Sequence, residues 1–546
     1  MVKLEERVRV VGEGWSSWGA LREKAAEKQQ EEAFYTLDIG DIVEKFRNWK
    51  EKMPRVEPHY AVKCNDMQIV LEVLASLGAG FDCASKAEIN QVLGLGVSPE
   101  LWHPQLGYVV RLKVVGRGRR WGRGRLGSTW LFRSGHQTRL KPFSSNVSIL
   151  NGGLTPGRII FANPAKPASH LRHALATGVT TMTFDSEFEL LKIKQTCPGA
   201  RLVVRIRCDA AVAQCPLGFK FGCDPVLEAP RLLKQARLLG LNVVGVSFHV
   251  GSGCQEPEVF ARAIAHAAVL FTLGEGLGHS MDLLDLGGGF PGGSGTSIQD
   301  VSTHFPIGCG VRIIAEPGRY FVASAFTLAV CVFAKRLLYD DNGAVAHAMY
   351  FVNDGVYGSF NCVLYDHQVV TCTPLKGNSG ATIPCSVWGP TCDSMDQILS
   401  QASLPQLEVG DWLVFRDMGA YTLPVASPFN GFPVPIVTAY VTRHLWSTSW
   451  AARRARWASA APAPWPPLRS ASRWRSSDAA AEPPLTSAAS SNLATNVADT
   501  YSETKADAVN RNIEIHIILL YNRSEFISFF FFQHSKLLLW LRFNSK

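Results

Sequence analysis

The 546-residue sequence has no uninterrupted apolar run of the ~20 residues that a membrane-spanning helix requires. Its longest apolar stretch, residues 513–543, is broken by Arg523, Glu525, Lys536 and Arg542. The N-terminal segment MVKLEERVRV carries too many charges for a secretory signal peptide. We therefore expect a cytoplasmic protein without a membrane partner.

Paired cysteines are also missing. None of the 13 cysteines, which lie between Cys64 and Cys392, forms a C-x-x-C pair or has the spacing of zinc ligands. An odd number of cysteines without such pairs is typical of a protein from a reducing compartment. The pattern excludes a disulfide scaffold and predicts no metal site.

Acidic residues are absent from residues 101–157, which contain 10 Lys and Arg, among them the run GRGRRWGRGR. Residues 446–546 have a net charge of +5, so the rest of the chain has −6 within a total of +9. An acidic body has no field that attracts polyanions, and we expect no nucleic-acid partner. Because residues 101–157 show neither helical nor strand periodicity, we interpret them as a translated non-coding insertion rather than an RNA-binding module.

Short β-branched runs followed by amphipathic stretches recur through the first 320 residues. Helices are expected at residues 85–95, 186–196 and 257–273. Eight strand-plus-helix units predict an α/β fold of the (β/α)8 barrel class, with a doubly wound sheet as the alternative. The strands are expected at residues 59–63, 80–84, 158–163, 181–185, 201–206, 243–250, 283–289 and 312–318.

Beyond residue 321 the pattern changes to short strands without long helices, which predicts an antiparallel β-domain. Residues 35–37, before a helix-like stretch at 39–49, are expected to pair with this domain. Its own strands are expected at residues 326–335, 348–352, 385–389, 411–415 and 426–432. The expected divisions are an N-terminal segment (1–40), a barrel (41–320) interrupted by the insertion, the β-domain (321–446) and a disordered or atypical tail (447–546). Within the tail, residues 451–500 are rich in Ala, Ser, Pro and Arg and should be disordered, and the apolar end beyond them is unlike a domain.

Lys63 ends the first expected strand inside the apolar run PHYAVKC, so its side chain would enter the mouth of the barrel. A lysine removed from water has a lowered pKa that suits Schiff-base chemistry. A structural lysine is the alternative. Asp82 ends the second strand and could be the N-cap of the helix that follows.

Three glycines, Gly287–Gly289, follow the seventh strand, where barrel enzymes often bind phosphate through backbone amides. Glu316 and Arg319 follow the eighth strand and could hold a heteroaromatic nitrogen and a phosphate. His249, in SFHVGSG with Ser252, could stack on a ring or line a phosphate site. The alternative interpretations are a tight turn for the three glycines, an ion pair for Glu316 and Arg319, and a core residue for His249.

In the β-domain, WGPTCDSMD contains Cys392 and Asp393, and LYDH contains Tyr365 and Asp366. Two carboxylates that converge on one pocket would suit a substrate that carries an ammonium group. Taken singly, each is more typical of a solvated loop, and Cys392 of a small buried apolar residue.

Twelve motifs in this order, along residues 35–446 apart from the insertion, resemble the eukaryotic ornithine decarboxylase family. The resemblance implies a pyridoxal-phosphate decarboxylase with an alanine-racemase-like barrel and a β-domain. It also implies a head-to-tail homodimer whose active sites are shared across the interface. The motifs are PHYAVKCN, GFDCASKAEI, FANPAKP, MTFDSEFEL, VVGVSFHVGSGC, LLDLGGGFPG, VRIIAEPGRYFVASAFTLAV, NDGVYGSFNC, LYDH, WGPTCDSMD, VGDWLVFRDMGAYT and FNGF.

The same resemblance implies how the cofactor, pyridoxal 5'-phosphate, is held. Lys63 would carry it covalently, Glu316 would pair with the pyridine nitrogen, His249 would stack on the ring and Asp82 would lie nearby. The residues that would hold its phosphate are Ser252, Gly287, Gly288, Gly289, Arg319 and Tyr421.

For the substrate, L-ornithine, the resemblance implies that Asp366 of one subunit and Asp393 of the other bind the distal ammonium. Tyr365 and Phe429 would line the pocket, and Cys392 would protonate the carbanion left after carbon dioxide departs. The implied reaction is decarboxylation of L-ornithine to putrescine, the first step of polyamine biosynthesis.

Two other functions are compatible with the family resemblance. One is a catalytically inactive antizyme inhibitor, with antizyme contacting residues 172–195. The other is a decarboxylase for lysine, arginine or diaminopimelate. The sequence departs from the family at the insertion and at residues 293–310, where the helix between the seventh and eighth strands is expected to be largely missing. Losing such a helix would cost several kcal/mol at ~25 cal/mol per Å² of lost burial.

Overall fold

The computed structural model describes residues 8–95, 154–293, 305, 309–377 and 380–447, and the short strands β20 (Ile518–Leu519) and β21 (Phe529–Phe530). The interpretation of the insertion and the expected disorder of the tail lie outside these residues, apart from 154–157, 447 and the two short strands. The chain divides into two units, Met1–Pro464 and Trp465–Lys546. In the second unit, β20 and β21 pair antiparallel. All that follows concerns the first unit.

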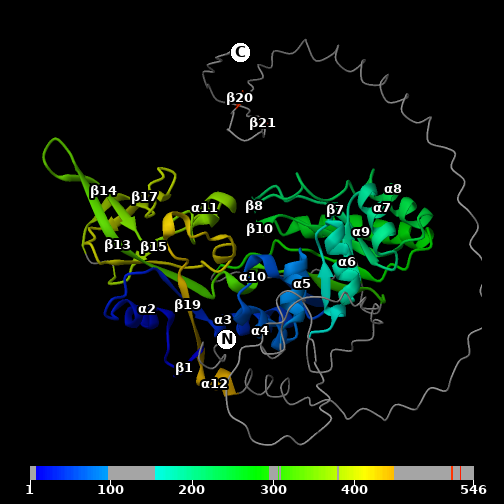
Figure 1. Cartoon of the computed structure of the whole chain (residues 1–546), viewed down its shortest axis with the longest axis horizontal. Coiled ribbons are helices and arrows are strands. Elements are labelled where there is room, and N and C mark those ends of the chain that lie inside the picture. Colours follow the sequence, from blue (N-terminus) through cyan, green and yellow to red (C-terminus); the bar gives the residue numbers. More distant parts are fainter. Residues whose placement is uncertain are drawn as a thin grey trace, which may run out of the picture. The chain divides into compact units, whose positions relative to one another are not determined.

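A closed parallel barrel contains all eight strands expected from the sequence, in the expected order (Figure 1). β12 pairs with β3, and this pairing closes the ring. The (β/α)8 prediction is therefore confirmed and the doubly wound sheet is excluded. In chain order the strands are β3 (Val56–Ala61), β4 (Gly80–Cys83), β5 (Ile159–Phe161), β6 (Thr181–Phe184), β7 (Arg201–Arg207), β9 (Asn242–His249), β11 (Leu283–Asp285) and β12 (Arg312–Ala315).

Helices follow most of the barrel strands. Between β11 and β12, the described residues 286–293, 305 and 309–311 contain no helix, and most of the segment 293–310, where a helix was expected to be largely missing, lies outside the described residues. Phe305 is buried there against Phe271, with ring centroids 5.1 Å apart. The helices and 3-10 turns of the barrel are η1 (Val62–Cys64), α4 (Gln68–Leu77), α5 (Lys86–Leu93), η3 (Pro156–Arg158), α6 (Ala168–Thr177), α7 (Glu187–Thr196), α8 (Ala229–Leu238), α9 (Glu258–Gly276) and α10 (Arg319–Val322).

Among the described helices, α9 alone is long and apolar enough to cross a membrane by length and composition. It contacts β9 and α8, and residues along it such as Phe260, Ile264 and Phe271 are buried. These contacts are those of a helix that packs on the barrel.

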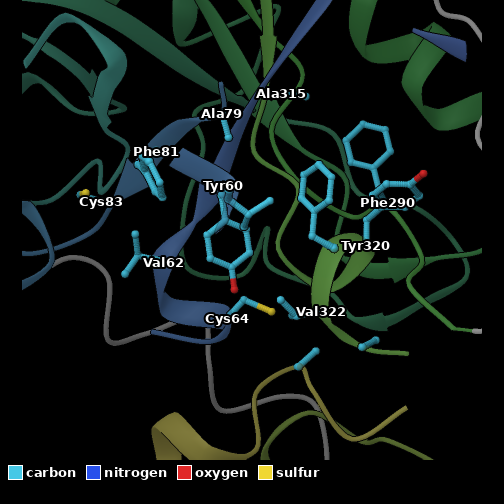
Figure 2. Packing of buried hydrophobic residues seen from close by; sticks show 14 of the residues in the cluster. Tyr60, Val62, Cys64, Ala79, Phe81, Cys83, Phe290, Ala315, Tyr320 and Val322 are labelled. Atoms are coloured by element: carbon cyan, nitrogen blue, oxygen red, sulfur yellow. The ribbon is translucent and has the colours of Figure 1, made fainter. Parts of the chain in front are cut away.

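Aromatic packing joins the outer face of the barrel to its helices. Tyr60 of β3 and Phe81 of β4 lie on neighbouring strands with ring centroids 6.4 Å apart, as Figure 2 shows. Trp49, fully buried, contacts the rings of Tyr320 and Phe321. Because side chains alternate along a strand, the next residue pair in register, Ala61 and Asp82, faces the barrel interior. This alternation brings a carboxylate inside the barrel.

The β-domain is a nine-stranded mixed sheet. Five strand pairings are antiparallel and three, β1–β19, β19–β2 and β14–β16, are parallel, so the expected antiparallel character holds for most of the sheet. β2 pairs with β13, which confirms the expected pairing of residues 35–37. The strands are β1 (Val8–Val11), β2 (Phe34–Asp38), β13 (Phe326–Tyr339), β14 (Val345–Val352), β15 (Cys372–Pro374), β16 (Thr382–Trp388), β17 (Gln397–Pro405), β18 (Trp412–Phe415) and β19 (Ile436–Thr442).

The expected strand at residues 426–432 is wrong, because this segment forms the 3-10 turn η5 (Phe429–Gly431). Pro428 has no N–H to donate to a sheet, and Asn430 and Gly431 have φ of 56° and 82°. The remaining helices and turns are α2 (Ser17–Ala25), α3 (Ile39–Lys52), α11 (Asn361–Tyr365), η4 (Leu423–Val425) and α12 (Arg443–Leu445). A two-stranded ribbon, β8 (Ala213–Cys215) with β10 (Ser252–Cys254), lies beyond the ends of β7 and β9.

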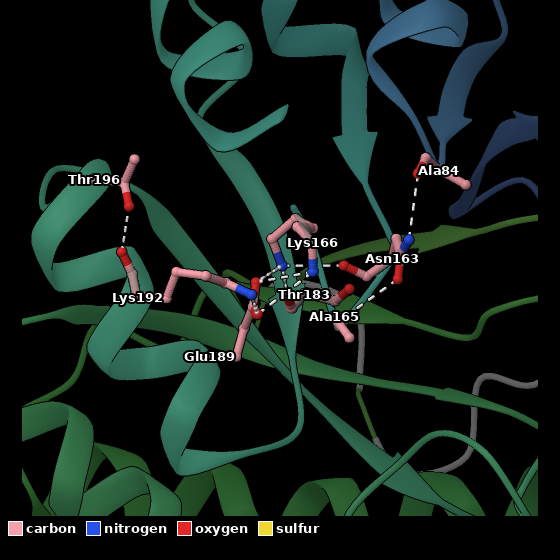
Figure 3. A network of polar contacts seen from close by, with 8 residues as sticks. All are labelled: Ala84, Asn163, Ala165, Lys166, Thr183, Glu189, Lys192 and Thr196. Carbon is pink, nitrogen blue, oxygen red and sulfur yellow. Dashed lines mark hydrogen bonds and ion pairs between the residues drawn. The ribbon is translucent and has the colours of Figure 1, made fainter. Parts of the chain in front are cut away.

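A buried ion pair ties the loop after β5 to α7. Lys166 Nζ lies 2.9 Å from Glu189 Oε1 and donates to the carbonyl oxygens of Asn163 and Thr183 at 3.0 and 2.5 Å (Figure 3). Burial lowers the pKa of Lys166 to about 8, although Glu189 acts in the opposite direction. Lys192 lies nearer the surface, and its Nζ is 2.5 Å from the other carboxylate oxygen of Glu189.

We expect Glu189→Ala to lower the free energy of unfolding by about 3 kcal/mol, because it leaves the Lys166 ammonium buried without its counter-ion. Lys192→Ala, which removes the half-exposed partner of the same carboxylate, should lower it by less than about 1 kcal/mol. Urea titration of both variants measures the difference. Equal losses in the free energy of unfolding would show that the buried Lys166–Glu189 pair contributes no more than the more exposed Lys192–Glu189 pair.

Candidate active site

The candidate site lies at the carboxyl ends of the barrel strands. β3 ends at Ala61, so Lys63 lies in η1 just after the strand rather than at its last residue. Its Nζ forms a close ion pair with Oδ2 of Asp82, at the end of β4. The Lys63 side chain is 42% exposed and that of Asp82 is fully buried. Lys63 therefore lies in the mouth of the barrel, with a carboxylate below it and an opening above it.

The expected lowered pKa of Lys63 is wrong for the protein without a cofactor. Burial acts to lower the pKa of this amine, but the carboxyl groups of Asp82 and Glu316 outweigh it and raise the pKa above its ordinary value. Asp82 is not the N-cap of α5, since Ser85 Oγ accepts the N–H of Glu88 at 3.2 Å. Oδ1 of Asp82 is buried and has no hydrogen-bond partner among the described residues.

Two further carboxyl groups lie inside the barrel. Glu316 follows β12 and hydrogen-bonds to Asp285, the last residue of β11. Burial and the neighbouring Asp285 raise the pKa of Glu316 well above its ordinary value, and burial raises the pKa of Asp285 to about 6. Glu316 therefore keeps its proton to a higher pH than an ordinary glutamate does, and the protonated form can donate to a basic ring nitrogen.

His249 is the last residue of β9 and is neutral. Burial, together with the positive charges of Arg205 and Lys63, lowers its pKa well below the ordinary value. Its Nδ1 accepts the backbone N–H of Gly251 at 3.1 Å, which places the ring proton on Nε2. A Cβ on Gly288 would lie 2.7 Å from His249 Nε2, so the glycine turn and the imidazole are neighbours.

The glycines after β11 form a turn that admits no side chains. A Cβ on Gly287 would lie 1.9 Å from the carbonyl oxygen of Phe248, and one on Gly289 would lie 2.6 Å from that of Gly251. Both glycines have positive φ, 61° and 110°. Backbone that is bare and closely packed in this way suits a phosphate group.

Arg319 completes this part of the site. Its Nη2 donates to Ser252 Oγ at 3.0 Å and forms a close ion pair with Asp366. Its guanidinium lies 5.2 Å from the centre of the Tyr421 ring. The backbone N–H of Tyr421 in turn donates to the carbonyl oxygen of Cys64 at 2.9 Å. The Nε of Arg319 is buried without a hydrogen-bond partner among the described residues. An unused Arg donor beside bare glycines fits a phosphate, and the free Asp82 oxygen and the Glu316 proton fit a pyridine ring. The residues present therefore fit pyridoxal phosphate.

The remaining candidates form a second group, in the β-domain. Asp393 accepts a short hydrogen bond from the Tyr357 hydroxyl and a backbone N–H from Met395 at 2.9 Å. Those bonds lower the pKa of Asp393. The ring of Phe429 lies 4.4 Å from that of Tyr357, and Cys392 is exposed. Among the described residues no recorded contact joins this group to Lys63 or its neighbours.

Tyr365 and Asp366, adjacent in sequence, have different surroundings. The side chain of Asp366 is buried against Arg319, whereas Tyr365 is 68% exposed at the end of α11. Among the described residues of one chain, no recorded contact joins Asp366 to Asp393.

Sequence reasoning missed three residues that the structure places in contact with the candidates. Asp285 lies in the expected strand LLDLGGG, and a carboxylate within an otherwise apolar strand could have indicated it. Tyr357, in NDGVYGSF, lay inside a motif without an assigned role. Gln214, which donates to Asp366, had no sequence signal because its ribbon was not predicted.

The fold and the site define a barrel enzyme that binds a pyridoxal cofactor. Residues 39–103 and 147–323 match the family model described as "Pyridoxal-dependent decarboxylase, pyridoxal binding domain". The chain is 41% identical over 468 residues to ornithine decarboxylase of Rattus norvegicus, covering 81% of this chain and 89% of that protein. It is 38% identical over 465 residues to antizyme inhibitor 2 of Xenopus laevis, with coverage of 81% and 89%.

Solved structures agree with this class. The arginine decarboxylase of Paramecium bursaria Chlorella virus, bound to agmatine, superposes with a TM-score of 0.63 at 32% identity, covering 78% of this chain and all of that one. The chain therefore belongs to the ornithine decarboxylase family of pyridoxal-dependent decarboxylases.

The carboxyl pair predicts a pH dependence. A carboxyl whose pKa rises on folding stabilises the folded state below its ordinary pKa, and this contribution is lost as the pH rises through the folded value. For Asp285 the window is pH 3.8 to about 6. In the cofactor-free protein, Asp285→Asn should flatten the decline in stability across this window and raise stability at pH 7 by on the order of 1–3 kcal/mol.

The control is Asp282→Asn, which changes a half-exposed carboxylate paired with Arg201 just before the same strand. Urea titrations at pH 4.5 to 7.5 measure both variants. An unchanged pH profile for Asp285→Asn would contradict the raised pKa of Asp285.

Proposed function

We propose that the protein catalyses the pyridoxal-phosphate-dependent decarboxylation of L-ornithine to putrescine and carbon dioxide, the first step of polyamine biosynthesis. The observation that carries the proposal is the ion pair of Lys63 with buried Asp82, near the buried carboxyl group of Glu316, at the mouth of a barrel. This arrangement occurs in a chain that is 41% identical to a known ornithine decarboxylase.

The barrel residues hold and orient the cofactor. Lys63 would bond to it covalently, and the Glu316 carboxyl group would pair with the pyridine nitrogen. Neutral His249 would pack on the ring without adding a charge, and Arg319 would bind the phosphate together with Ser252, Tyr421 and the backbone of the glycine turn. When bound, pyridoxal phosphate accepts the electron pair that remains on the substrate α-carbon as carbon dioxide leaves. Asp82 keeps a negative charge beside the Lys63 amine.

The β-domain residues select the substrate and complete the reaction. Asp366 and Asp393 bind the distal ammonium of ornithine, and Tyr365 and Phe429 line the pocket around its carbon chain. A substrate without that ammonium would leave buried carboxylates unpaired, which gives discrimination. The Cys392 thiol gives its proton to the α-carbon, where a C–H bond replaces the broken bond to the carboxylate.

The active enzyme is a homodimer in this proposal, with Cys392 and Asp393 contributed to each site by the partner subunit. Support comes from the surface around these residues and from the fact that, among the described residues, no recorded contact joins them to Lys63. Met395 is 63% exposed and Phe429 44%, an unusual exposure for large apolar side chains close to a polar site. A second subunit would cover them.

Ornithine is favoured over lysine, arginine and diaminopimelate because several relatives that are 39–41% identical to this chain are ornithine decarboxylases. An inactive role like that of an antizyme inhibitor is disfavoured, since every proposed cofactor-binding residue is present. Antizyme is nevertheless a proposed partner at residues 172–195, where Phe188 and Leu175 are 83% and 48% exposed. We further propose a cytoplasmic location.

Lys63→Ala should abolish release of carbon dioxide from L-ornithine and remove the absorbance band of covalently bound cofactor, because no other described lysine adjoins Asp82. Lys86→Ala, an exposed lysine on α5, is the matched control and should keep both. A panel of ornithine, lysine, arginine and diaminopimelate measured on the wild type identifies the substrate. Full activity of Lys63→Ala would refute the proposed function.

The dimer proposal predicts complementation. Lys63→Ala and Cys392→Ala homodimers should both be nearly inactive, but mixing and reassociating them should restore activity to about a quarter of wild type. About half of the dimers are then mixed, and each mixed dimer has one intact site of two. Turnover of the mixture measures this. If mixing restores nothing while chromatography shows mixed dimers, the site is not shared.

A further inference from the structure

Asp366 is held by an amide as well as by an arginine. Gln214 Nε2 donates to Asp366 Oδ2 at 2.9 Å and to the backbone oxygen of the same residue at 2.7 Å. The Arg319 guanidinium pairs with the same Oδ2. Gln214 therefore fixes both the carboxylate and the main chain of Asp366, at the end of α11.

The ribbon β8–β10 carries Gln214 to this position. Ser252 pairs with Cys215 and Cys254 with Ala213, so Gln214 lies opposite Gly253. Gly253 has a φ of 59°, and a Cβ there would lie 2.8 Å from Gln214 Oε1. The missing side chain at Gly253 is what leaves room for Gln214.

The same ribbon is fixed to the phosphate region of the barrel. Arg319 Nη2 donates to Ser252 Oγ at 3.0 Å, and Cys254 N donates to the carbonyl oxygen of Gly289 at 2.9 Å. Gln214 is thus positioned by the elements that would hold the cofactor phosphate, although its own contacts are with a residue of the β-domain.

The charges explain why an amide is suited to this position. A phosphate dianion competes with Asp366 for the Arg319 guanidinium, since Nη2 is already shared between Asp366 and Ser252. Once Arg319 turns to phosphate, Asp366 would lose its cation and its orientation together. Gln214 supplies donors without charge, so it keeps the carboxylate in place and leaves its negative charge for a cationic ligand.

We propose that Gln214 is a positioning residue that holds Asp366 ready for the distal ammonium of the substrate. This inference rests on the proposed function, in which Asp366 binds that ammonium. It predicts that Gln214 affects the affinity for ornithine and putrescine, and that it has little effect on the chemical step or on cofactor binding.

Gln214→Ala should raise the KM for L-ornithine about tenfold and change kcat less than about twofold. The Kd of putrescine, measured by calorimetry on the cofactor-loaded protein, should weaken by the same factor. Cofactor absorbance and melting temperature should stay at wild-type values. Gln255→Ala, an exposed glutamine just after β10, is the control and should change none of these.

Two more variants separate hydrogen bonding from space filling. Gln214→Met keeps the length and volume without the donor and should behave as Gln214→Ala. Gln214→Glu places a carboxylate against Asp366 and should raise KM further, with partial recovery at lower pH as the pair takes up a proton.

Several results would overturn the inference. They are a wild-type KM in Gln214→Met, equal loss of kcat and cofactor in Gln214→Ala, and an unchanged putrescine Kd. If the wild type decarboxylates ornithine but one of these occurs, the inference fails alone. If the wild type acts on no basic amino acid, the proposed function fails and this inference fails with it.

Discussion

Three carboxyl groups lie inside the barrel beneath one lysine, and they cannot all be ionised in so little water. Asp82, Asp285 and Glu316 come from β4, β11 and the residue after β12, and closure of the barrel brings them together. Burial and the neighbouring carboxyl groups raise the pKa of Glu316 well above its ordinary value, while Lys63 pairs with Asp82. The site thus offers a carboxyl group that favours its protonated form and an amine, which suit the ring nitrogen and the aldehyde of a pyridine cofactor.

The two domains divide the work. The barrel positions every residue proposed to touch the cofactor except Tyr421, and the β-domain carries the residues proposed to touch the far end of the substrate. Arg319 and Asp366 join the two sets through one ion pair. Binding of a phosphate would change that contact, so occupation of the cofactor site and availability of the substrate carboxylate are connected through a single guanidinium.

Periodicity predicted most of the fold because it is a local property. The β-branched runs gave all eight barrel strands within a few residues, and Lys63 and the glycine turn followed from their places at strand ends. The segment at 426–432 was misread because its aromatic residues suggested a strand, whereas Pro428 and the left-handed Asn430 oppose one. Local sequence propensity alone did not decide whether this segment forms a strand or a turn.

The sequence did not predict effects that depend on residues far apart in the chain. The pKa of Lys63 is raised rather than lowered because Asp82 and Glu316 reach it from other strands. Gln214 meets Asp366 across 152 residues of chain, and no pattern near either residue indicates the other. The roles of the site residues rest on the family motifs, and the geometry described above is compatible with those roles.

The position of the insertion has a consequence for the architecture. It leaves the barrel after α5 and returns before β5, at the amino ends of the strands, whereas Lys63 and the glycine turn lie at the carboxyl ends. β4 and β5 remain hydrogen-bonded to each other across this break. Each doubling of a connection costs only about 0.6 kcal/mol in closure entropy. Backbone hydrogen bonds between β4 and β5, rather than a short connection, keep these two strands adjacent.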